Sequence, residues 1–182
     1  MAKRIYPTEG LATVSEVTYQ PSQTVVQYHA WPQRYVEMAG TLAAQYKLST
    51  SPTPGKAVCG AYASLLRVHP QRLWLVGGDL APDVKPDLPP DIGCVQDLSH
   101  AWHTIQVDSS IASQLLNQFV SVNLVPQHFP VDSVALTPLH GIGVVLWCRP
   151  GGISVLTPRS FAQSIWHALV ETRRRLPSQK PL

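Results

Sequence analysis

The segment DLSHAWH, at positions 97–103, places an aspartate, a serine and two histidines within seven residues. Serine, histidine and aspartate form hydrolase triads, and two histidines at this spacing could be half of a metal site. In an extended chain, however, His100 and His103 face apart and cannot bind one metal as strand neighbours. A triad is also assembled from separate segments, with its serine on a glycine-flanked turn, and no G-x-S-x-G sequence occurs here. We therefore interpret the segment as structural hydrogen bonding, without a catalytic residue or a metal ligand.

Other motifs that could bind a cofactor are incomplete. The glycine-rich segments VGGD at 76–79 and HGIG at 140–143 do not complete G-x-G-x-x-G, and no P-loop lysine motif occurs. The remaining histidines are scattered without the cysteine or carboxylate spacing of a metal site. Between Asp132 and Glu171 there is no acidic residue, although proton transfer needs a positioned acid or base. These absences argue against catalysis by this chain alone, and we expect it to hold no cofactor.

The composition favours an intracellular protein that has a partner. Hydrophobic residues make up 45% of the 182 residues and charged residues only 14%, which suggests that part of the surface is covered. The net charge of +3 comes from basic residues near the two ends, so nucleic-acid binding has little support. Three separated cysteines indicate no disulfide framework. The N-terminal segment lacks the apolar core of a signal peptide, and no apolar run approaches the ~20 residues of a membrane span, so we expect a cytoplasmic location and no membrane contact.

In the first part of the chain, the hydrophobic pattern predicts a strand, a helix and two strands. The predicted elements are a strand over 24–30, a helix over 31–47, and strands over 57–68 and 72–78, with a further short strand allowed within 11–19. The helix is expected to begin at Pro32, which suits a first helical turn. Its apolar face is Tyr35, Met38, Ala39, Leu42 and Tyr46.

The second part of the chain repeats this order. Its predicted elements are a strand over 100–107, a helix over 109–120, strands over 133–138, 143–148 and 153–157, and a final helix over 157–177. Asp108 or Ser109 is expected to cap the first helix and Thr157 the second. Arg173, Arg174 and Arg175 suit a helix C-terminus, where cations complement the helix dipole.

The repeat predicts an α+β fold in a single domain, 1–182, built from two related halves. We place these halves at 10–78 and 94–176. The segment 79–93 joins them as a proline-rich seam, because its prolines exclude a regular helix or a central strand.

The order and spacing of several short sequences resemble the gamma subunit of heterotetrameric sarcosine oxidase, best over 94–174. The landmarks are Asp97, Ser99 and His100; Leu115 and Leu116; Asn123-Leu124 to Phe129-Pro130; Thr137; Leu146-Trp147; and Pro158-Arg159-Ser160-Phe161-Ala162 with Ile165-Trp166. The resemblance implies two intertwined ferredoxin-like halves, similar to the folate-binding domain of the glycine-cleavage aminomethyltransferase. At the place where related transferases carry folate-binding acidic residues, this chain reads LHGIGVVLW, so transferase activity is not expected.

The resemblance also implies the function of the whole complex. This chain would be a non-catalytic structural subunit beside alpha, beta and delta subunits, in a complex that oxidatively demethylates sarcosine or a related N-methyl amine. The one-carbon unit would pass to tetrahydrofolate. FAD, FMN, NAD, tetrahydrofolate and zinc are expected in the partner subunits. The chain is somewhat short for the family and its proline seam is unusual, so the amine could differ.

Two other functions stay open at the level of the sequence. One is a stand-alone folate-binding one-carbon transferase of the same fold, and the other is a scaffold for iron–sulfur assembly or RNA modification. The scaffold would need a reactive cysteine or a basic groove, and neither is evident in the sequence. Large aromatic residues often anchor interfaces, and Phe129, Trp147, Phe161 and Trp166 are the predicted anchors for partner subunits.

Overall fold

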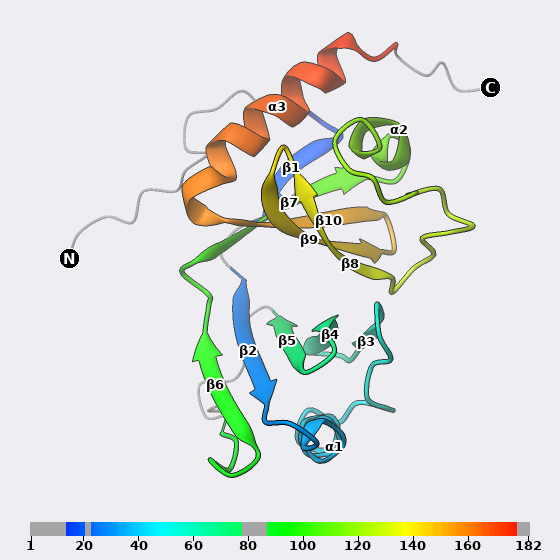
Figure 1. The fold of residues 1–182 in the computed structure, drawn as a ribbon. Coiled ribbons are helices and arrows are strands. Elements are labelled where there is room, and N and C mark those ends of the chain that lie inside the picture. Colours follow the sequence, from blue (N-terminus) through cyan, green and yellow to red (C-terminus); the bar gives the residue numbers. More distant parts are fainter. Residues whose placement is uncertain (1–13, 21–22, 78–86, 178–182) are drawn as a thin grey trace.

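The computed structural model describes residues 14–20, 23–77 and 87–177. Within these ranges the chain forms two five-stranded antiparallel sheets, with helices on the outer face of each sheet (Figure 1). We call them sheet A and sheet B. No helix within the described ranges is long and apolar enough to cross a membrane.

Sheet A carries the longer of the outer helices. Its strand order is β1-β7-β10-β9-β8, with β1 (Val17–Gln20), β7 (Trp102–Asp108), β8 (Val134–Leu139), β9 (Ile142–Arg149) and β10 (Gly152–Pro158). Helix α2 (Ala112–Leu116) and helix α3 (Ala162–Arg175) cover its outer face, and a short 3-10 helix η1 (Arg159–Phe161) leads into α3.

Sheet B is built mostly from the first half of the chain. Its strand order is β3-β4-β5-β2-β6, with β2 (Thr24–Ala30), β3 (Ala57–Cys59), β4 (Ala63–His69), β5 (Arg72–Gly77) and β6 (Gly93–Asp97). Helix α1 (Tyr35–Gln45) packs on its outer face.

Three clusters of buried apolar side chains fill the spaces between the layers of helices and sheets. The first lies between sheet A and helices α2 and α3, the second between sheet B and α1, and the third between the two sheets. Strand β9 shows why the sequence specifies this order. Val144 and Leu146 face the helices, whereas Val145 and Trp147 face sheet B. A strand buried on both faces needs a continuous apolar run, and GVVLWC supplies it.

Each sheet contains one strand from the other half of the sequence: β1 lies in sheet A and β6 lies in sheet B. Strand β1 precedes β2 in the chain but pairs with β7 in sheet A, from Val17 opposite Val107 to Gln20 opposite Thr104. Strand β6 follows the proline-rich segment but pairs with β2 in sheet B. Most of the predicted seam, 79–86, lies outside the described residues. The division into halves at 10–78 and 94–176 stays a prediction, but neither sheet is made from one half alone.

Several sequence-based boundaries were wrong in the first half. The predicted strand over 57–68 is two strands, because the backbone turns at Gly60, whose N–H donates to Ala63 O at 2.9 Å. The helix predicted from Pro32 begins at Tyr35, because Gln33 has a φ of 69°, which is not helical.

In the second half, β6 was not predicted, and the predicted strand over 100–107 begins at Trp102. The helix over 109–120 is shortened to α2. Its N-cap is Ile111 instead of Asp108 or Ser109. The expected cap Thr157 is instead a fully buried residue of β10, and α3 has no side-chain cap.

Candidate functional site

The segment 97–103 is a crossing between the two sheets. Strand β6 ends at Asp97 in sheet B and β7 begins at Trp102 in sheet A, so the intervening residues form a turn. The Asp97 carboxylate accepts a hydrogen bond from the backbone N–H of Ser99 at 2.8 Å, and Ser99 Oγ accepts one from the N–H of Val25 at 3.0 Å. Hydrogen bonds from Ser99 lower the pKa of Asp97. These bonds fix the turn to β2, which supports the structural interpretation.

The two histidines of this segment are in different environments. His100 is exposed in the turn, whereas His103 is buried in β7. The His103 ring stacks on Tyr19 of β1 with 5.5 Å between ring centroids, and the Tyr19 hydroxyl contacts its Nδ1. His103 therefore contacts the exchanged strand β1. Across the described ranges, no group of three His, Cys, Asp or Glu side chains is placed to hold a metal ion.

Three of the four predicted interface anchors lie in the core. Phe129 and Trp166 belong to the cluster beneath α2 and α3, with 6% and 2% of their surface exposed, and Trp147 lies between the sheets with 4% exposed. Their apolar surface is used by the fold itself and is not available to a partner. Phe161, at the start of α3, is 45% exposed and is the one of the four that could contact another subunit.

A hollow that the sequence did not indicate lies at the end of β9. It has a volume of about 210 Å³, and the connection between β3 and β4 forms one wall. The lining residues are Gln23, Gly60, Ala61, Tyr62, Ala63, Ser64, Val76, Gly77, Trp147 and Arg149. The Arg149 guanidinium stacks on the Trp147 ring, 4.7 Å from its centroid. Arg149 also lines a second, apolar hollow beside Val131 and the turn at 150–152.

The sheets are also joined at the edge where β3 meets β8. The Val134 N–H donates to Gly55 O, and the Ala57 N–H donates to Asp132 O, both at 2.8 Å. The Asp132 carboxylate accepts a hydrogen bond from Cys59 Sγ at 3.2 Å. Burial raises the pKa of the Cys59 thiol, which favours its protonated form.

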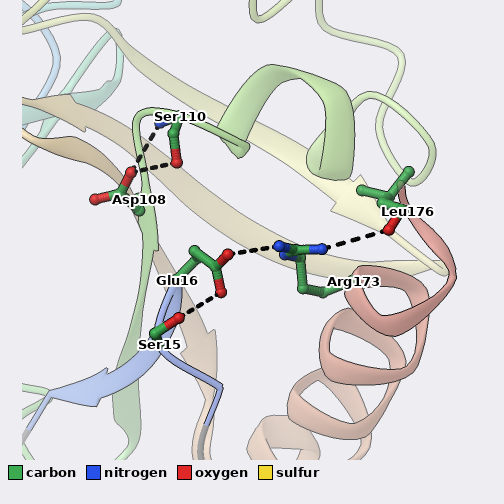
Figure 2. Close-up of polar contacts among 6 residues, drawn as sticks. All are labelled: Ser15, Glu16, Asp108, Ser110, Arg173 and Leu176. Carbon is green, nitrogen blue, oxygen red and sulfur yellow. Dashed lines mark hydrogen bonds and ion pairs between the residues drawn. The ribbon is translucent and has the colours of Figure 1, made fainter. Parts of the chain in front are cut away.

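The best-defined ion pair of the described chain joins the exchanged strand to the last helix. Glu16 precedes β1, and its carboxylate accepts a hydrogen bond from Arg173 of α3 at 2.5 Å (Figure 2). Arg173 also donates to Leu176 O at 3.5 Å, and Ser15 donates to Glu16 at 2.7 Å. The bond from Arg173, more than that from Ser15, lowers the pKa of Glu16 to about 2. Arg173 thus has a specific partner in addition to its place at a helix C-terminus.

Local sequence patterns gave little indication of the hollow at the end of β9 or of the ion pair between Glu16 and Arg173. Gly60 could have marked the turn between β3 and β4, because a Cβ there would lie 2.5 Å from the Leu48 side chain. Nothing in the sequence signals that Glu16 and Arg173 meet, since 157 positions separate them.

Comparison with known proteins identifies the fold. No protein-family model and no curated protein sequence matches the chain. Among solved structures, a chain of the heterotetrameric sarcosine oxidase from Corynebacterium sp. U-96, in complex with pyrrole 2-carboxylate, matches with a TM-score of 0.78. The two chains share one fold. The match covers 98% of this chain and 99% of that chain at 20% sequence identity.

Proposed function

We propose that this chain is a non-catalytic subunit of a heterotetrameric complex of the sarcosine oxidase type. The observation that carries the proposal is the length of the structural match, which leaves almost no part of either chain outside the common fold. The complex would oxidatively demethylate sarcosine or a related N-methyl amine and pass the one-carbon unit to tetrahydrofolate.

The distribution of ionisable groups supports a role without chemistry of its own. Strands β8, β9 and β10 contain no acidic residue, because none occurs between Asp132 and Glu171. The acidic side chains Glu16, Asp97 and Asp108 accept hydrogen bonds that hold turns or helix ends. In this proposal FAD, FMN, NAD, tetrahydrofolate and zinc are held by the alpha, beta and delta subunits.

Phe161 is the contact that we propose for a partner subunit. It is a large apolar side chain at the junction of η1 and α3, and 45% of its surface is exposed. Truncating it to alanine removes exposed surface without opening the core, so the chain itself should keep its stability.

Affinity purification of the tagged chain from its native cell tests the proposal. Flavoprotein subunits should elute with the chain in a fixed ratio, recognised by their yellow colour and visible absorbance. The Phe161→Ala variant should recover less flavoprotein. The matched control Val36→Ala removes a side chain of α1 that is 81% exposed and should recover the normal amount.

A colourless chain that elutes alone would count against membership of such a complex. Tight binding of tetrahydrofolate by the isolated chain in calorimetry would favour the one-carbon transferase instead.

A further inference from the structure

The hollow at the end of β9 has the chemistry of an anion site. We propose that it binds a compact oxyanion, such as a carboxylate or a phosphate group, through Arg149. This inference does not depend on the proposed function, because it rests only on residues of this chain.

Arg149 is a half-buried cation, and the described part of the chain offers it no anionic partner. Among the described residues, no carboxylate lies within ion-pair distance of its guanidinium and no acceptor is hydrogen-bonded to it. By contrast, Arg34 pairs with Glu37 at 2.8 Å and Arg173 pairs with Glu16 at 2.5 Å. No nitrogen of Arg149 is among the buried, unpartnered atoms, so its donors are open to a ligand, and a bound anion would accept charge-assisted hydrogen bonds from them.

Stacking on Trp147 holds the guanidinium in place before any ligand arrives. The guanidinium carbon lies 4.7 Å from the Trp147 ring centroid, and the ring itself is fixed between the two sheets. A guanidinium ordered in this way loses little conformational entropy when it binds a planar or tetrahedral oxyanion. Trp147 Nε1 has no acceptor either, but it is closed to water. We therefore assign the ligand contact to Arg149 and use the indole as a reporter.

The other described residues that line the hollow present mainly polar surface, and none of them is a carboxylate. Gln23 accepts a hydrogen bond from Thr104 through its oxygen at 3.2 Å, which leaves its amide N–H groups as donors. The Ser64 hydroxyl and the backbone of the connection at 60–62 complete the lining. Gly77 lets this connection approach closely, since a Cβ at Gly77 would lie 2.9 Å from Tyr62 O. A polar lining beside one cation, without a carboxylate among the described residues, favours a small anion over a cation or an apolar ligand.

Nuclear magnetic resonance of the full chain tests the site. Sodium acetate, sodium phosphate and sodium chloride are titrated at constant ionic strength, and the indole ¹H–¹⁵N signal of Trp147 is followed, assigned with a Trp147→Phe variant. Acetate or phosphate should shift the signal saturably and chloride should not. Saturation by acetate alone assigns a carboxylate, and saturation by phosphate alone assigns a tetrahedral anion.

The variants decide whether Arg149 is responsible. Arg149→Gln should weaken binding at least roughly tenfold, the loss of about one charge-assisted hydrogen bond. Arg149→Lys keeps the charge but loses the planar stack, so its affinity for the anion should lie between that of the wild type and that of Arg149→Gln. The control Arg174→Gln removes an exposed cation of α3 and should bind as the wild type does. Amide dispersion checks that each variant is folded. No saturable shift with either anion, or equal binding by Arg149→Gln and the wild type, would overturn the proposal.

Discussion

Replacing Glu16 with glutamine removes the charge that holds strand β1 to helix α3. The carboxylate and Arg173 are 2.5 Å apart, with 26% and 15% of their side chains exposed. A fall in the Glu16 pKa from 4.5 to about 2 corresponds to about 3 kcal/mol without screening, and the hydrogen bond from Arg173 is the largest of several causes, ahead of the one from Ser15. Because a quarter of the Glu16 side chain is open to water, we expect a smaller loss for Glu16→Gln, about 1–2 kcal/mol of unfolding free energy.

Urea unfolding of the wild type and Glu16→Gln at several pH values measures this loss. The folded state lowers the pKa of Glu16, so its contribution is complete above the unfolded pKa near 4.5 and is lost as the pH falls toward about 2. The difference between the two proteins should be constant from about pH 6 to pH 8 and less than half as large near pH 3. Hydrogen exchange of the β1 amides should accelerate in the variant.

A double-mutant cycle identifies the interaction responsible. The second change, Arg173→Gln, should add little to Glu16→Gln if the two residues act through one bond. Equal unfolding midpoints for the wild type and Glu16→Gln at neutral pH would refute the reasoning. A difference that does not change with pH would show that the charge of Glu16 is not its cause.

Three further predictions concern the turns. Ser99→Ala leaves the Val25 N–H without its acceptor and should lower the unfolding free energy by about 1–2 kcal/mol, measured by urea unfolding. Gly152→Ala should cost about 3 kcal/mol or more, because Gly152 has a φ of 149° and a Cβ there would lie 2.0 Å from Val107 O. Gly151→Ala, in the same turn, meets only open space at a φ of 89° and should cost about 1 kcal/mol, so similar melting temperatures for the two glycine variants would contradict the steric argument.

Local sequence patterns were sufficient for the elements whose apolar periodicity is strong. Strand β2 has the bounds predicted for TVVQYHA, because its β-branched residues fill both faces of a buried strand. Helix α3 also forms within the range 157–177 predicted for the last helix, and its apolar residues Ile165 and Leu169 are buried. Strand β6 was missed because GCVQD is a largely exposed edge strand with little apolar patterning, next to a proline-rich segment.

The candidate site could not be predicted because its contacts are distant in the sequence. Arg149 of β9 in sheet A lines one hollow with Tyr62, which lies in the connection between β3 and β4 of sheet B. The pairing of β1 with β7 has no local signature. For the segment 97–103, local patterns predicted structural hydrogen bonds, and such bonds are present. Its aspartate and serine are used in a turn, and its two histidines differ in burial.

The exchange of β1 and β6 has a consequence for synthesis on the ribosome. Sheet B lacks its last strand until residue 97 has emerged, and β1 must wait without a neighbour until β7 appears, about 85 positions later. Two fragments cut at the proline-rich segment would each carry a strand whose hydrogen-bonding partner is on the other fragment. Since β7 also needs β10 as its other neighbour and α3 covers the same sheet, newly made chains should gain protease resistance late and in one step, once α3 has left the exit tunnel.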